Sequence, residues 1–173
     1  MKYLIILMLI VCSLASQAQT EEDSTYRNFV YFEAFGSSLA YSLNYERVII
    51  DRKKLNISLR TGFMILPPFV TDVEGVTLGF PTGINFVLGN NIKSFVIGVG
   101  YTNITDITTG GMDADPAELP KYDYIHYATL KAAYRKIHPN DVFFEAGLFT
   151  FYDIGISEFI PPIWIGVSVG YAF

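Results

Sequence analysis

The sequence has little cysteine and little charge. It contains one Cys in 173 residues, and only 17% of its residues are charged. A single Cys cannot form an intrachain disulfide, so a disulfide-stapled fold is excluded. Acidic residues outnumber basic ones, 17 against 12, and no basic stripe occurs. This balance excludes the electrostatic pattern typical of a nucleic-acid-binding protein.

Long apolar runs are also missing after the first residues. The chain is 51% hydrophobic with a mean hydropathy of +0.32. Yet beyond the N-terminus no stretch approaches the ~18 consecutive apolar residues of a transmembrane helix. The apolar residues instead occur in short alternating pieces interrupted by Gly, Asn and charge, which is the weak pattern typical of a transmembrane barrel.

Residues 1–18 form the exception, because Lys2 precedes an apolar core and small residues, Ser16 and Ala18, stand at positions −3 and −1 of a cleavage site. We predict a secretory signal peptide that is cleaved after Ala18 and a polar periplasmic lead-in over residues 19–27. Removing Lys2 leaves 11 basic residues against 17 acidic ones, so the processed chain carries a formal charge of −6 and no cysteine.

A period-2 alternation of side chains runs through residues 28–173, and in a strand successive side chains point to opposite faces. Eight strands are predicted, over residues 29–35, 39–46, 55–63, 75–88, 95–102, 124–135, 142–149 and 163–173. The fold class is therefore all-β, an eight-stranded antiparallel up-and-down transmembrane β-barrel. Pro81 makes the fourth strand the least regular one, because proline cannot donate to a ladder.

An even strand number places both ends of the barrel domain on one side. The connections on that side are short, at 51–54, 89–91 and 136–141, whereas three of the four opposite ones are long, at 66–74, 105–122 and 153–162; the exception is 36–38. Tyr and Phe gather at the ends of the apolar rows, as barrel girdles do. One predicted belt contains Tyr45, Phe86, Phe95, Tyr134, Phe144, Tyr171 and Phe173, and the other contains Tyr41, Phe63, Phe80 and Tyr101.

The last eleven residues set a wholly apolar face against a face of mostly small residues and end on Tyr171, Ala172 and Phe173. This ending resembles the closing strand of outer-membrane β-barrels, and the whole pattern resembles the small eight-stranded members, such as the OmpA transmembrane domain and the OmpX class. The resemblance implies a monomer in contact with outer-membrane lipid. It also implies that Tyr171 and Phe173 are read by the barrel-assembly machinery.

The alternation places Arg135 and five other charged residues at inward positions, and the five are the candidates for a charge network: Glu33, Glu46, Arg60, Lys131 and Glu145. Eight strands enclose a space just wide enough for side chains to fill, and bulky residues share the predicted inner face, namely Tyr31, Phe35, Phe143, Phe149 and Trp164. We therefore predict a mutually neutralising charge network in the lumen. The alternative is a path for protons or ions.

Two other residue groups invite a chemical interpretation. His126 and His138 suggest a lipid hydrolase, but no Ser lies two positions after His126, so the nearby nucleophile is missing. Asp113, Asp115 and Glu118 carry oxygen ligands, but they lack the Gly and terminal Glu spacing of a calcium loop. We predict no catalytic, cofactor or metal site, and an acidic surface loop at residues 113–118.

The sequence thus indicates an integral outer-membrane barrel without enzymatic activity, with a structural or surface-binding role for its outer loops; their extracellular ligand is not specified. A narrow channel for small solutes is the first alternative. The second is a secreted lipocalin-like carrier, which would bury its apolar face around a ligand. A carrier would show a more charged outer surface than these rows provide.

Overall fold

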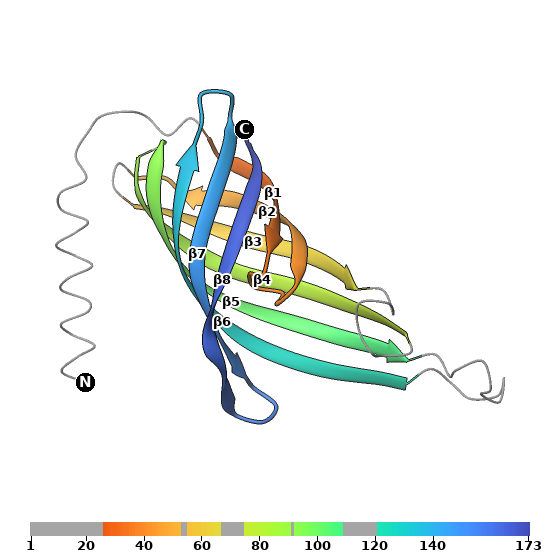
Figure 1. Cartoon of the computed structure of the whole chain (residues 1–173). Coiled ribbons are helices and arrows are strands. Elements are labelled where there is room, and N and C mark those ends of the chain that lie inside the picture. The colour runs from red at the N-terminus through yellow and green to blue at the C-terminus, as the bar shows by residue number, and fades with distance from the viewer. Residues whose placement is uncertain (1–25, 53–54, 67–74, 91, 109–120) are drawn as a thin grey trace, which may run out of the picture.

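The computed structural model describes residues 26–52, 55–66, 75–90, 92–108 and 121–173. Each strand pairs antiparallel with its neighbours in sequence, and β1 pairs with β8, so the sheet closes into a barrel (Figure 1). The predicted eight-stranded antiparallel barrel is confirmed. The strands are β1 Asn28–Ala34, β2 Tyr41–Ile50, β3 Leu55–Leu66, β4 Gly75–Gly89, β5 Lys93–Thr108, β6 Lys121–Ile137, β7 Val142–Asp153 and β8 Glu158–Ala172. The described part of the chain has no helix of the length and apolarity needed to cross a membrane.

Side chains along the strands alternate between a buried inner face and an exposed outer face, with a break at the register shift after Val48 in β2. In β2, Ser42 and Asn44 are buried, whereas Leu43 is 59% exposed. In β8, Ser168 is buried and Ile165 is 69% exposed. The period-2 interpretation of these strands is confirmed: the outer face is apolar, and the buried charged side chains are inside.

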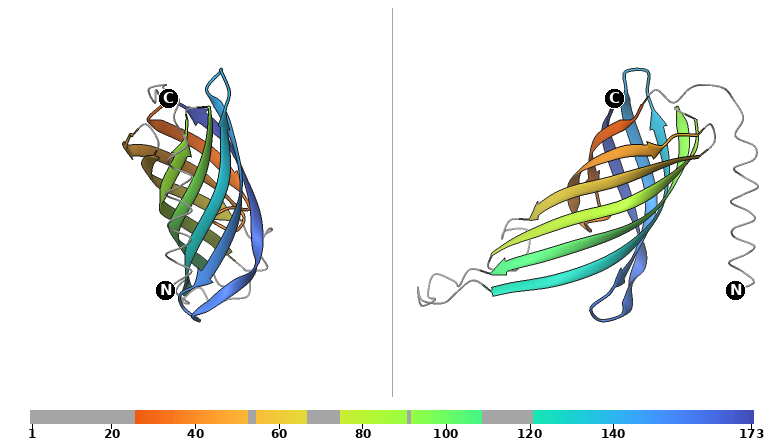
Figure 2. Two further views of the ribbon diagram at one scale, coloured as in Figure 1. Left: turned by 90° about the vertical axis from the view of Figure 1, so that its left-hand side faces the viewer. Right: turned by 180° about the vertical axis from the view of Figure 1, so that it is seen from behind.

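The barrel has two unlike ends. The turn end carries the connections β2–β3, β4–β5 and β6–β7 together with Phe173, and the loop end carries the other four connections. β4, β5 and β6 have 15 to 17 residues, whereas β1 has only 7. The longer strands continue past their shorter neighbours, and β3–β6 splay away from the β7–β8 hairpin toward the loop end (Figures 1 and 2).

Two of the loops predicted from the sequence are longer than the corresponding connections in the structure. The β5–β6 ladder continues without a break from Lys93↔Lys136 to Thr108↔Lys121, so the connection is 109–120 rather than 105–122. Main-chain pairing does not need an apolar alternation, which explains why the polar sequence there concealed the strand ends. The predicted loop 153–162 is a turn over residues 154–157 in which the Asp153 carboxylate accepts a hydrogen bond from Gly155 N at 2.8 Å.

Pro81 in β4 and the two prolines in β8 lie at irregular points of the β-ladders. The β7–β8 register shifts between Phe149↔Trp164 and Phe151↔Ile160, so residues 161 and 162, both Pro, fall in a bulge, where a missing N–H is tolerated. Pro81 of β4 pairs with Thr102 of β5. On its other side, the β3–β4 ladder is interrupted between Thr61↔Thr82 and Met64↔Gly79. The strand containing Pro81 is confirmed.

The β1–β2 connection folds into the barrel. Ser37 and Ser38 are 1% exposed, whereas Phe35 is 58% exposed with φ of 56°. The predicted inward position of Phe35 is therefore wrong: β1 ends at Ala34, and the left-handed backbone at Phe35 turns its ring outward. Leu39 closes the same turn with φ of 67°, a conformation uncommon for a residue with a side chain. We call residues 36–38 the inserted turn.

The interior contains two hydrophobic clusters. The cluster at the turn end is Phe29, Tyr31, Val48, Ile137, Phe143 and Ala172. The cluster at the loop end is Met64, Leu66, Ile104, Tyr127, Phe149 and Phe151, with Trp164 packed against it. Charged side chains contact both clusters from between them, and these form the candidate site.

Candidate functional site

Six charged side chains are buried inside the described part of the barrel. They are Glu33, Glu46, Glu145, Arg60, Lys131 and Arg135. The five residues predicted to form the charge network all lie in the interior. The structure adds a sixth member, Arg135, which is 1% exposed. The three carboxylates and three cations balance, so the enclosed set has no formal net charge.

Glu46 is the principal acceptor of this network. The Arg135 guanidinium donates to both of its oxygens, Nη1 to Oε1 at 3.1 Å and Nη2 to Oε2 at 2.8 Å. Ser58 donates to Oε1 at 2.7 Å, and Asn85 and Tyr31 donate to Oε2 at 2.9 and 3.4 Å. Bidentate Arg–carboxylate pairing is strong and fixes orientation, so Glu46 is held by side chains from β1, β3, β4 and β6.

Arg135 joins Glu46 to Glu145. Its Nε donates to Glu145 Oε2 at 2.8 Å, and the Lys131 ammonium lies 2.5 Å from the other carboxylate oxygen of Glu145. The Arg135 guanidinium also lies over the rings of Phe29 and Phe143, 4.8 and 5.0 Å from their centroids. These contacts combine ion pairing with cation–π attraction, which is strongest away from water.

A second ion pair anchors the inserted turn. Arg60 Nη1 donates to Glu33 Oε2 at 3.1 Å, and Arg60 Nη2 donates to Ser37 Oγ. Glu33 also accepts from Ser37 N at 2.8 Å, and Thr102 donates to Ser37 O at 2.7 Å. Because each polar group of Ser37 is bound to a barrel side chain, the inserted turn is fixed in the lumen.

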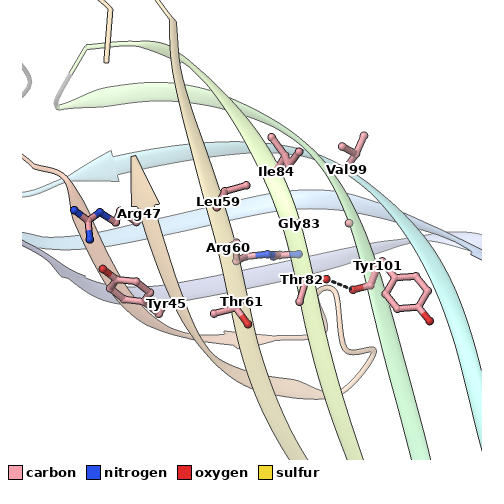
Figure 3. A pocket seen from close by; sticks show the side chains of 11 residues that line it. Tyr45, Arg47, Leu59, Arg60, Thr61, Thr82, Gly83, Ile84, Val99 and Tyr101 are labelled. Carbon is pink, nitrogen blue, oxygen red and sulfur yellow. Dashed lines mark hydrogen bonds between the residues drawn. The ribbon is translucent and has the colours of Figure 1, made fainter. Parts of the chain in front are cut away.

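Glycines on the adjacent strands leave room for Arg60. Arg60 pairs with Gly83, which pairs with Gly100, and Figure 3 shows the Arg60 side chain extending from β3 toward β4. A Cβ on Gly100 would lie 3.4 Å from the guanidinium, and one on Gly83 would lie 2.7 Å from the main-chain oxygen of Val99. Neither site accepts a larger residue without displacing its neighbours.

Aromatic side chains close the charged layer toward both ends. Phe143 is fully buried on the turn-end side, and Phe149, 2% exposed, lies 5.8 Å from the Lys131 ammonium on the loop-end side. A cavity of about 30 Å³ reaches Arg135 from the turn end, which is room for about two water molecules. Side chains of the charged layer and of the two hydrophobic clusters therefore occupy the described interior on both sides of Arg135.

The two histidines have unlike surroundings. His126 lies on the outer face, stacked on Tyr101, whose hydroxyl is 2.7 Å from its Nδ1, and Asn103 Nδ2 lies 3.2 Å away. His138 packs edge-on against Phe144. Within the described residues no group of three His, Cys, Asp or Glu side chains is placed to hold a metal ion. The acidic group Asp113, Asp115 and Glu118 lies outside those residues.

The end of the chain is integrated into the turn end. Phe173 O accepts from Asn28 N at 2.9 Å, and the Tyr171 hydroxyl donates to Asp141 at 3.2 Å. Tyr26 also donates to Asp141, and this hydrogen bond is the main cause of the raised pKa of the Tyr26 phenol. The last residues of the predicted lead-in are thus attached to the barrel.

Taken together, the closed antiparallel sheet, the exposed apolar exterior and the neutralised charged interior define an eight-stranded barrel of inverted polarity, the class that transmembrane barrels represent. Soluble barrels place their charges outside.

A comparison with known structures agrees with the β-barrel fold. The chain is similar to the N-terminal β-barrel domain of Pseudomonas aeruginosa OprF, with a TM-score of 0.53 and 12% identity over 88% of this chain and 100% of that one. It also matches the Yersinia pestis outer membrane protein Ail, solved in a phospholipid bilayer nanodisc, with a TM-score of 0.45 and 10% identity over 86% and 99% of the two chains. No protein-family model and no curated protein matches the sequence.

Proposed function

We propose that this protein is a non-enzymatic integral barrel of the bacterial outer membrane, with its turn end in the periplasm and its loop end outside the cell. The inverted polarity carries the proposal. Exposed Leu43, Leu130, Ile165 and Val167 cover the outer face, and contiguous apolar surface on that scale is stable only against lipid or a partner. The β1–β8 ladder closes the described barrel wall into a ring of paired strands, as a bilayer requires.

Cell fractionation combined with a heat-modifiability gel tests this proposal. The folded barrel should fractionate with outer-membrane markers and migrate differently from the boiled chain, because a closed barrel resists detergent unfolding. Recovery in the soluble periplasmic or secreted fraction would contradict membrane residence. A membrane-bound chain without a heat-dependent shift would contradict closure.

We further propose that β8 carries the assembly signal, with Tyr171 and Phe173 as the residues read by the assembly machinery. Support comes from their exposed rings, 49% and 54% accessible at the turn end. Replacing Phe173 by Ala should lower the folded fraction in cells more than it lowers refolding of purified protein in vesicles. Equal losses in both would mean that Phe173 serves stability alone.

We assign the surface-binding role to the part of β3–β6 that splays toward the loop end, and we call this part the protruding sheet. β6 pairs with β7 only from Tyr127 onward, and His126 O still accepts a main-chain hydrogen bond from Ile154 N at 2.9 Å, so in the described structure its segment 121–125 has a ladder partner on β5 alone. A strand with one free edge can accept an added strand from a partner. Tyr122 and Tyr124, 53% and 60% exposed on that segment, supply apolar contact area beside the free main-chain groups.

Epitope tags test the orientation on which this role depends. A tag inserted within 109–120 should be labelled by antibody on intact cells, whereas the same tag at Pro139 and Asn140 in the β6–β7 turn should be labelled only after permeabilisation. The reverse pattern would place the protruding sheet in the periplasm and remove the surface-binding role.

The filled interior also supports a non-conducting barrel over the two alternatives. A carrier needs a cavity of ~300–1,000 Å³ for a small ligand, but the described interior is occupied by the charge network and the inserted turn. A channel needs a continuous aqueous path, and Phe143 and Phe149 stand on either side of the charged layer.

A further inference from the structure

The outer wall carries a groove across β2–β5. Its volume is about 690 Å³, and its floor is made by Thr61 and Thr82, which pair directly across β3 and β4. The next residues in the same row are Tyr45 on β2 and Tyr101 on β5, so two short side chains lie between two aromatic ones (Figure 3). The row therefore forms a trough two strands wide between two aromatic rings.

A cation stands at one end of this groove. Arg47 lines it beside Tyr45 and is exposed on the outer face. It pairs across the ladder with Asn28 on one side and Leu59 on the other. Among the residues that the structure describes, Arg47 makes no ion pair and no side-chain hydrogen bond. An exposed arginine on an apolar wall thus lacks an anionic partner in the described part of the chain.

The position of Arg47 matches the headgroup level of the proposed periplasmic leaflet. Tyr45 donates to Asn28 at 2.7 Å, and Asn28 binds the main chain of Phe173. Arg47 therefore lies in the aromatic belt at the turn end, where interfacial rings mark the membrane boundary. From there the groove passes Leu59 and Thr61 and continues along the wall toward the loop end, into the depth of acyl chains.

We propose that this groove binds one anionic phospholipid of the periplasmic leaflet. The lipid phosphate pairs with the Arg47 guanidinium, which suits phosphate oxygens through its paired donors. One acyl chain lies over Thr61 and Thr82 between the rings of Tyr45 and Tyr101. Charge complementarity selects an anionic headgroup, and the apolar trough selects a lipid over free phosphate. The inference rests on the proposed function, since the groove meets lipid only when the barrel spans a bilayer.

Native mass spectrometry of the barrel released from mixed nanodiscs tests the site. Discs contain phosphatidylglycerol and phosphatidylcholine with identical acyl chains, and the retained lipid is counted and identified. Wild-type protein should retain one phosphatidylglycerol. Arg47→Gln should reduce its excess over phosphatidylcholine about fivefold, as expected for one basic residue near the surface. Thr61→Phe should lower retention of both lipids by filling the groove.

Matched variants on β6 separate the site from general lipid adhesion. Lys136→Gln removes another outward cation and Ala132→Phe adds bulk to another outward position; both should leave retention unchanged. Failure of the barrel to enter nanodiscs would refute the proposed function itself. An inserted barrel that retains both lipids equally, responds equally to Lys136→Gln, or retains added inorganic phosphate without lipid would refute the site alone.

Discussion

At the scale of single residues, Arg135 makes the most hydrogen bonds of the interior cations, because it donates to two carboxylates at once. Glu46 and Glu145 each depend on it, and a second cation, Lys131, supports Glu145 only. Removing one partner of a buried ion pair leaves an uncompensated charge, which costs far more than the pair itself contributes. The ion pairs therefore specify the interior packing more than they raise stability.

Replacing Arg60 by Ala should lower the free energy of unfolding by ~3–5 kcal/mol, because it strands the carboxylate of Glu33. A urea titration in lipid vesicles, followed by the fluorescence of Trp164, measures this loss. The double variant Glu33→Gln with Arg60→Ala should recover part of the stability. A loss below that of the exposed control Lys136→Ala would contradict the pairing.

Replacing Leu43 by Arg should destabilise the barrel by ~2–4 kcal/mol, because the side chain faces the bilayer core. Leu43 is 59% exposed on the outer wall. Ile154→Arg is the matched control: Ile154 is 45% exposed, but it lies in the β7–β8 turn outside the proposed membrane. Similar refolding midpoints in vesicles for the two variants would contradict the proposal that Leu43 faces the bilayer core.

At the scale of elements, closure depends on the seam between β1 and β8. The two strands pair from Phe29↔Ala172 to Ala34↔Val167, and small inward residues of β8 let β1 approach. A Cβ on Gly170 would lie 2.3 Å from both the Val30 main-chain oxygen and the Tyr31 Cβ. Backbone atoms cannot move aside as a flexible side chain does, so the seam has little tolerance there.

Gly170→Ala should therefore weaken closure, with an expected cost of ~1–3 kcal/mol for overpacking. The variant should unfold at lower temperature in the heat-modifiability gel, and amide exchange should rise along β1. Ser168→Ala, on the same inner face two residues away, removes a hydroxyl without adding volume and should unfold close to wild type. A Gly170→Ala barrel as heat-resistant as Ser168→Ala would show that the seam can relax.

At the scale of the whole molecule, the charged layer, its aromatic covers and the inserted turn together determine whether the barrel conducts. An eight-stranded barrel has room for side chains but not for a wide aqueous path. Ionised groups confined there must be paired, and the described ones are. Any opening would have to break several ion pairs together.

Purified wild-type protein should therefore form no stable open channel in planar bilayers at neutral pH. Arg60→Ala should remain silent as well, because Phe143, Phe149 and the remaining ion pairs still fill the lumen. The measurement is single-channel recording with both proteins at equal density. Long-lived ohmic current steps from the wild-type protein would contradict a non-conducting barrel and would favour transport of small solutes as its function.

The cellular form of the chain is a second property of the whole molecule. We predict that the signal peptide is removed after Ala18, so Edman sequencing of the protein purified from the outer-membrane fraction should begin at Gln19. The physical reason is the pair of small residues at Ser16 and Ala18, which fit a signal peptidase site. A retained Met1 would contradict the prediction.

The sequence alone determined the strand number, the fold class and, with the exception of Phe35, which residues of the predicted charge network and its aromatic neighbours face inward, because the side-chain period of a strand is two wherever one face is buried. Alternation placed Glu33, Glu46, Arg60, Lys131 and Glu145 in the lumen without any knowledge of their partners. The same alternation marked Arg135 as inward, yet its place in the network was missed, since periodicity along one strand carries no information about which charges meet across the barrel.

Only the tertiary structure decided the partners and the ends of the elements. The stagger between strands brings Arg135 of β6 to Glu46 of β2, 89 positions apart in the chain, and this stagger is set by closure. Closure also leaves a space that the inserted turn fills, so Phe35 leaves the alternation and faces outward. β5 and β6 continue through polar residues, because main-chain hydrogen bonds do not depend on the alternation of side chains from which the strands were predicted.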